Sequence, residues 1–320
     1  PIERAAKHIT DSLSDKNHNE TLDWLIAEKF IPSYFNQIPD MLNALPKEKS
    51  DFQNGMVVGG GTDLYVQRHD QLIDQNVDLI SNATDLKFIE IENGSCKIGA
   101  GTTATNLMES NIFMSAFPQL KSHLKLVASS PIRNVATIGG NFVNASPIGD
   151  LTVFFLALDS QITLTQNKGN RIIYLKDFYK GYKDLDKSPD EIISTISFKL
   201  PTQDSYFNFE KVSKRIHLDI ASVNTAIQLS VADNEISKAH LSAGGVGPTP
   251  KYLGETSAFL NGEKLSSQNI KSANDLLQGE ISPISDVRGS ANYKRLLLRQ
   301  LFYAHFITLF PDQFSLNSFK

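Results

Sequence analysis

The spacing of hydrophobic residues changes along the chain. Residues 20–30 and 39–45 carry apolar side chains at helical intervals, and prolines at positions 39 and 46 bracket the second stretch, as expected for a helix start and stop. A β-branched run at Met56–Val58 then leads into three glycines, and short apolar runs follow at 77–80, 88–91 and 96–98. The first half is therefore predicted to mix helices and strands.

Strand signals dominate from about residue 160. They lie at 161–165, 171–174, 192–200, 207–213, 220–231 and 236–243. Their connections are too short for parallel crossovers, so we predict antiparallel pairing. The last part of the chain returns to helical spacing, on a face traced by Leu296, Leu297, Leu301, Ala304 and Thr308. The whole pattern predicts an α+β fold.

Composition narrows the class of protein. The chain has 320 residues, of which 41% are hydrophobic, and no run of 18 apolar residues that would span a membrane. Its net charge of −4 is too mild for coating nucleic acid or an anionic membrane. A globular protein of up to two domains is expected, with small molecules or other proteins as partners.

Cys96 is the single cysteine of the chain. One thiol cannot form a disulfide framework or an all-cysteine iron–sulfur cluster, which fits a cytoplasmic location. Cys96 alternates with Ile98 on an expected strand, so we interpret it as a packed side chain without a redox role. The seven histidines offer no i, i+4 ligand pair, and no metal site is predicted.

Familiar catalytic motifs are absent from the sequence. It has no Gly-x-Ser-x-Gly elbow, no His-Glu-x-x-His, no Cys-x-x-Cys and no Gly-x4-Gly-Lys phosphate loop. Hydrolase and P-loop classes are therefore disfavoured, and these patterns select no residue as a catalytic acid, base or nucleophile. Two glycine-bearing segments carry the remaining chemistry.

The first of these segments is Val57-Val58-Gly59-Gly60-Gly61-Thr62-Asp63-Leu64. A strand that runs into three glycines lets backbone N–H groups converge on an anion such as a pyrophosphate. The Rossmann fingerprint Gly-x-Gly-x-x-Gly is not met, because Leu64 stands where its third glycine belongs. From these residues alone, a plain strand-to-helix turn is an equally good interpretation.

The second segment runs from Ile132 to Asp150 and holds Ala-Thr-Ile-Gly-Gly-Asn at 136–141. Its small, amide and hydroxyl residues suit a loop whose backbone presses against a polar ligand. Asp150 could accept hydrogen bonds from ribose or ribityl hydroxyls, or cap the helix expected from Leu151. The two segments together indicate a nucleotide-like ligand.

Both segments resemble the flavin domain of the molybdenum hydroxylases. The resemblance continues through 176–182, 209–215, 243–251 and 282–295 and covers the chain from about residue 31 to the end. It implies a PCMH-type FAD-binding domain of two α/β subdomains at 31–203. A CO dehydrogenase flavoprotein-like C-terminal domain, an antiparallel sheet plus helices, is implied at 204–320. Residues 1–30 resemble the linker from an iron–sulfur domain in the small subunit of bacterial xanthine dehydrogenases.

The resemblance also implies which residues hold FAD. The segment Val57 to Leu64 is expected to wrap the pyrophosphate, with Thr62 and Asp63 nearest to it. Thr137, Gly140 and Asn141 are expected to continue this cradle. Asp150 is expected at ribityl or ribose hydroxyls.

Three further positions are expected at the isoalloxazine ring: Val127, where relatives often carry an aromatic residue, Ile193 and Lys211. A lysine there would stabilise negative charge on the reduced ring. After Arg215 relatives tend to carry acidic residues, whereas this chain retains only Asp219. The resemblance therefore implies a less negative field beside the flavin. Leu218 and Ile220 are expected to pack in a strand.

The function implied by the resemblance is electron transfer in an oxidoreductase. FAD would receive electrons from a molybdenum cofactor on a large subunit, through 2Fe-2S clusters on a missing domain, and pass them to NAD. The complete enzyme would be a xanthine dehydrogenase of purine catabolism. Two alternatives stay open: the flavin subunit of a carbon monoxide, aldehyde, nicotinate or aromatic acyl-CoA hydroxylase, and a flavin-free assembly module.

Overall fold

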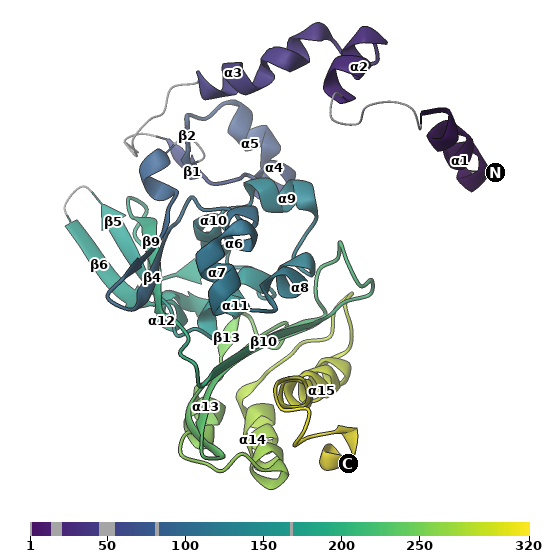
Figure 1. Cartoon of the computed structure of the whole chain (residues 1–320). Coiled ribbons are helices and arrows are strands. Elements are labelled where there is room, and N and C mark those ends of the chain that lie inside the picture. Colours follow the sequence, from purple (N-terminus) through teal and green to yellow (C-terminus); the bar gives the residue numbers. More distant parts are fainter. Residues whose placement is uncertain (1, 14–20, 45–54, 81–82, 167–168) are drawn as a thin grey trace. The chain divides into compact units, whose positions relative to one another are not determined.

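Residues 2–13, 21–44, 55–80, 83–166 and 169–320 are described by a computed structural model of the chain (Figure 1). The chain divides into two compact units, Pro1–Lys47 and Glu48–Lys320. No helix in the described ranges is long and apolar enough to cross a membrane.

The first unit is helical. It holds α1 (Ile2–Leu13), α2 (Thr21–Ala27), the 3-10 helix η2 (Ser33–Gln37) and α3 (Ile38–Asn43). Both helices expected from hydrophobic spacing are thus confirmed, as α2 and α3, and the proline at position 46 lies outside the described residues. The first helix α1, in the stretch expected to be a linker, was not predicted.

The second unit opens with a small parallel sheet. Strands β1 (Met56–Val58) and β2 (Val77–Leu79) pair with Met56 opposite Val77. The connection between them contains the glycine loop and two short helices, α4 (Leu64–Gln67) and α5 (His69–Ile73). A crossover of this kind is what parallel pairing requires. The 3-10 helix η4 (Thr84–Leu86) follows.

A five-stranded antiparallel sheet comes next. Its order is β3-β4-β9-β5-β6, formed by β3 (Ile89–Glu92), β4 (Ser95–Gly99), β9 (Ile192–Lys199), β5 (Gln161–Gln166) and β6 (Gly169–Tyr174). These strands confirm the expected ones. Cys96 on β4 is fully buried, and this burial raises the pKa of its thiol to about 12, which confirms it as a packed side chain.

Six short helices lie between β4 and β5 in the described range 83–166, and the rings of Phe113 and Phe155 from two of them pack on Phe198 of β9. They are α6 (Ala104–Glu109), α7 (Asn111–Ala116), α8 (Leu120–Lys125), α9 (Ser130–Val135), α10 (Ile138–Asn144) and α11 (Asp150–Leu156). After its first residue α11 has no polar face, and its residues from Leu151 onward are all buried, as expected for a helix inside a core. Next along the chain are α12 (Leu175–Phe178) and two short strands, β7 (Tyr179–Gly181) and β8 (Asp184–Leu185).

The C-terminal part is an antiparallel sheet with helices. The sheet order β10-β11-β12-β13 follows the chain, through β10 (Ser205–Val212), β11 (Val223–Ala232), β12 (Glu235–Gly244) and β13 (Lys251–Tyr252). Helices α13 (Gly254–Leu260), α14 (Ser267–Glu280) and α15 (Ala291–Leu309) and the 3-10 helix η5 (Leu316–Phe319) complete it. The buried α11 contacts β11, β12 and β13, while α13 and α15 contact the same sheet (Figure 1). The fold class is therefore confirmed.

Two details of the sequence interpretation are wrong. The fully buried face of α15 shares only Leu301 with the predicted one: it consists of Lys294, Leu298, Leu301, Phe302, His305 and Phe306. Three consecutive leucines at 296–298 cannot fix the phase of a helix, and polar Lys294 and His305 occupy its buried side because Asp286 and Asn208 bond to them. Leu218 and Ile220 do not pack in a strand, since β11 begins at Val223 and both side chains are exposed.

Candidate functional site

The glycine loop joins β1 to α4. Within the described residues, the backbone N–H groups of Gly59 through Asp63 donate no hydrogen bond. Gly61 has a left-handed φ of 65°, and the ring of Tyr65 fills the space where a side chain would stand. Converging N–H groups in such a turn form a site for an anion.

The loop lies directly on the second glycine-bearing segment. A Cβ atom added to Gly60 would stand 1.8 Å from the carbonyl oxygen of Val135, and one added to Gly59 would stand 2.3 Å from Thr137 Oγ1. Only glycine permits so close an approach. The fold therefore brings together the two segments that the sequence analysis selected.

The second segment is held by its own hydrogen bonds. Thr137 caps α10, and its hydroxyl accepts the N–H of Gly140 at 3.2 Å. The next two donors of α10 are also used, because Ile138 N bonds Thr102 O and Gly139 N bonds Ala100 O, both at 3.0 Å. Thr137 and Gly140 therefore shape the cradle. The N–H groups at the start of α10 are already used, so the unused backbone donors are those of the glycine loop.

These bonds reveal a segment that the sequence analysis missed. Residues 99–103, Gly-Ala-Gly-Thr-Thr, lie directly behind α10. A Cβ on Gly139 would stand 2.8 Å from the Ala100 side chain. A glycine at the end of a strand and another two residues later were the signal that could have identified it.

Asn141 connects the cradle to α11. Its side-chain oxygen accepts from the N–H and the hydroxyl of Thr152, at 3.2 and 3.0 Å. Its amide nitrogen donates to no other residue in the described part of the chain. Asn141 therefore keeps a free donor next to the first turn of α11.

Asp150 stands at the start of α11. The N-cap of this helix is Gly149, so the capping alternative for Asp150 is wrong. Its Oδ2 accepts from Lys211 Nζ and its Oδ1 from Asn224 Nδ2, both at 2.6 Å. Burial raises the pKa of Asp150, an effect opposed by Lys211 and Asn224.

Lys211 ties this carboxylate to the turn between α8 and α9. Its side chain is 2% exposed, and Nζ also donates to the carbonyl of Leu126 at 2.7 Å. The same turn is fixed by Arg133, whose guanidinium donates to the carbonyls of Val127 and Ala128 at 2.7 and 2.8 Å. The ammonium is therefore held between a carboxylate and a backbone carbonyl.

Two of the residues expected at the ring have buried side chains. The side chains of Val127 and Ile193 are 9% and 3% exposed and pack in the main core. Ile193 adjoins Ser194, whose carbonyl accepts from Ala100 N behind α10. The side chains of both residues therefore pack in the core.

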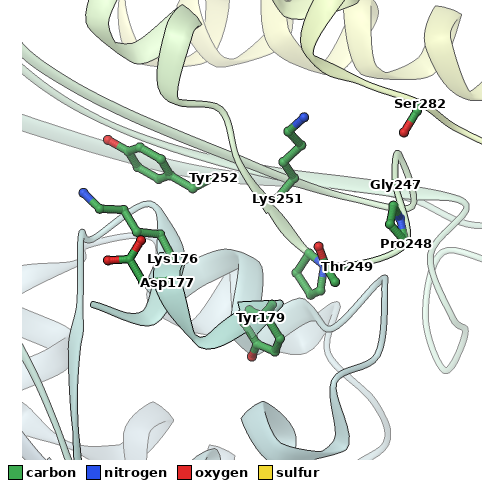
Figure 2. Close-up of a pocket in the computed structure, with 10 residues that line it drawn as sticks. Lys176, Asp177, Tyr179, Gly247, Pro248, Thr249, Lys251, Tyr252 and Ser282 are labelled. Carbon is green, nitrogen blue, oxygen red and sulfur yellow. The ribbon is translucent and has the colours of Figure 1, made fainter. Parts of the chain in front are cut away.

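A separate cavity of about 400 Å³ is lined by none of the expected FAD residues. Figure 2 shows its lining from α12 and the loop before β13. Its two lysines already have partners, because Lys176 pairs with Asp159 at 2.9 Å and Lys251 donates to the carbonyl of Glu280. The anion site that the glycine loop suggests is therefore separate from this cavity.

Comparison with known families decides the nature of the ligand. Residues 30–202 match the family described as the FAD binding domain in molybdopterin dehydrogenase. The chain belongs to this family. Residues 208–309 match the CO dehydrogenase flavoprotein C-terminal domain. The protein is therefore an FAD-binding oxidoreductase component of the molybdenum hydroxylase type.

Named relatives of this FAD-binding family member differ in substrate. The glyceraldehyde dehydrogenase medium chain of Sulfolobus acidocaldarius is 29% identical over 69% of this chain and 78% of its own length. The xanthine dehydrogenase FAD-binding subunit of Escherichia coli is 26% identical over 82% and 90%. A solved Cu,Mo-CO dehydrogenase chain superposes with a TM-score of 0.72 at 25% identity, over 78% and 88%.

The residues present fit FAD. The free N–H groups of the glycine loop suit its pyrophosphate, and the spare amide donor of Asn141 suits a hydroxyl or phosphate oxygen. The buried pair of Lys211 and Asp150 joins the start of α11 to the turn between α8 and α9.

Proposed function

We propose that this chain is the FAD-binding electron-transfer module of a xanthine dehydrogenase, passing electrons from molybdenum and iron–sulfur centres on partner domains to NAD. The FAD role rests on one observation: the glycine loop has unused N–H groups and lies on the second glycine-bearing segment, which ends at Asp150 and its buried partner Lys211. The choice of xanthine dehydrogenase is supported by similarity to a relative of that name. FAD, when bound, accepts electrons singly and releases them as a hydride.

In this proposal the glycine loop, Val57 to Leu64, binds the pyrophosphate through its backbone, with Thr62 and Asp63 closest. Asn141 donates its free amide to the cofactor, and Lys211 places a positive charge beside the ring. A held cation needs no reorganisation when negative charge develops nearby. None of these residues has to transfer a proton.

The partners in this proposal are a large subunit with the molybdenum cofactor and a domain with 2Fe-2S clusters. Two observations support their location outside this chain. The sequence has a single cysteine, which cannot hold such clusters. A relative of similar length is named as an FAD-binding subunit of a xanthine dehydrogenase.

The second candidate is the flavin component of another molybdenum hydroxylase. Two relatives at 29% identity are medium chains of a glyceraldehyde dehydrogenase and a carbon monoxide dehydrogenase, and another relative is a nicotinate dehydrogenase subunit. Substrate choice in this proposal lies on the molybdenum subunit, so the flavin site is the same for either candidate.

The test is turnover by the assembled enzyme purified with its partners. We expect reduction of NAD with xanthine, and no reduction with glyceraldehyde, nicotinate or carbon monoxide. Preference for one of the other substrates would replace the first candidate by the second. Lys211→Met should slow NAD reduction without changing the metal content. The matched control is Asn274→Ala, which replaces a buried residue of α14 and should leave NAD reduction unchanged.

A further inference from the structure

Asn224 is a buried residue of β11 whose side chain points to the carboxylate of Asp150. Its Nδ2 donates to Asp150 Oδ1 at 2.6 Å and to the carbonyl of Ile148 at 3.3 Å. The residue itself is 0% exposed. Neither the family motifs quoted from the sequence nor the expected FAD residues include it.

The amide is fixed in one orientation. Both hydrogens of Nδ2 are used, while Oδ1 is buried and has no partner among the described residues. An unsatisfied buried acceptor has a free-energy cost of about 1–3 kcal/mol. Because Asn224 leaves its oxygen unpaired at this cost, we infer that its two N–H donors, to Asp150 and to Ile148, are the groups that the site requires.

Gly244 provides the space for this amide. A Cβ added to Gly244 on the neighbouring strand β12 would stand 2.2 Å from Asn224 Oδ1. Asn224 and Gly244 are paired residues of the two strands. The C-terminal sheet is therefore shaped at this pair to present one amide to Asp150.

We propose that Asn224 is a positioning residue of the FAD site: it orients the Asp150 carboxylate so that Lys211 stays paired with it at the Leu126 carbonyl. The effect of Asn224 on the cofactor then passes through Asp150 and Lys211. This inference rests on the proposed FAD site around Lys211.

Without Asn224, the carboxylate keeps a single strong donor and is free to turn away from Lys211. A less compensated lysine charge beside the ring favours the reduced, more negative flavin. Replacement of Asn224 should therefore raise the midpoint potential of bound FAD and weaken its binding. Replacement of Lys211 removes the charge itself and should lower the potential.

The experiment is a double-mutant cycle on FAD affinity and midpoint potential. We expect Asn224→Ala to weaken FAD binding about tenfold and to shift the potential to more positive values. In the Lys211→Met background the same change should alter affinity less than twofold. Asn274→Ala removes another buried asparagine with an unpaired Oδ1 and should leave both quantities unchanged.

Additive effects in the cycle, or an unchanged affinity and potential in Asn224→Ala, would overturn the inference. If the wild-type chain takes up no FAD, the proposed function fails instead. Circular dichroism and thermal unfolding check that each variant folds. If Asn224→Ala does not fold, Asn224→Ser, which keeps one short donor, is measured in the same cycle and must meet the same criteria.

Discussion

Gly60→Ala tests the contact between the two glycine-bearing segments. The new Cβ would stand 1.8 Å from Val135 O and 2.4 Å from Val135 C, whereas real Cβ contacts are essentially never below 3.0 Å. The loop must therefore move by at least about 1.2 Å away from the α9–α10 junction, since a backbone carbonyl cannot rotate aside. The N–H groups proposed to hold the pyrophosphate move with it.

The magnitude follows from the cost of overpacking. Forced contacts in a packed region cost about 1–3 kcal/mol, which corresponds to a loss of FAD affinity of about 5- to 150-fold when the strain is relieved only by displacing the loop. The affinity is measured by titrating the FAD-free chain and following the quenching of flavin fluorescence.

Gly279→Ala is the matched control for Gly60→Ala. Gly279 lies near the end of α14, and a Cβ there meets nothing within 4 Å. Alanine at a helical position should stabilise the fold by about 0.5–1 kcal/mol and leave FAD binding unchanged. If folded Gly60→Ala bound FAD as tightly as wild type, the loop would not be the pyrophosphate site.

Other expectations concern the fold. Leu298→Ala should lower the free energy of unfolding in urea by about 2–5 kcal/mol, and Leu296→Ala by less than about 0.5 kcal/mol, because Leu298 is buried and Leu296 is exposed. Equal losses in the two variants would contradict the assigned face of α15. Burial lowers the pKa of His123 to about 4 from its usual 6.5. Its contribution to stability is therefore present above pH 6.5 and is lost as the pH falls toward 4, by about 2 kcal/mol between pH 7 and 5; an equal slope in His123→Gln would refute this. Cys96 should resist iodoacetamide at pH 8 and react in urea, and modification of the folded chain would show that its burial is wrong.

Local sequence patterns predicted most strands and the glycine loop. The strand signals after residue 160 correspond to β5, β6, β9, β10, β11 and β12, because alternating and β-branched residues report directly on a half-buried sheet. The glycine run was visible because the loop packs against backbone, and only glycine fits there. The identity of the ligand came from resemblance, since backbone N–H groups do not distinguish one pyrophosphate from another.

Contacts between distant segments were not predictable from the same patterns. In the sequence, Asn224 and Gly244 look like ordinary strand residues. Their proposed role depends on a contact with Asp150, which lies 74 residues away from Asn224 in the chain. The face of α15 was misjudged because Lys294 and His305 are buried by partners on other elements. In the loop after β10, Leu218 takes a left-handed φ of 56°, which apolar alternation does not reveal.

The direct test of the central claim is the flavin content of the purified chain after saturation with FAD and removal of the excess. The visible absorbance spectrum should show one FAD per chain, and Gly60→Ala should retain much less. A wild-type chain that remains colourless under these conditions would contradict the account of the glycine loop as a cofactor site.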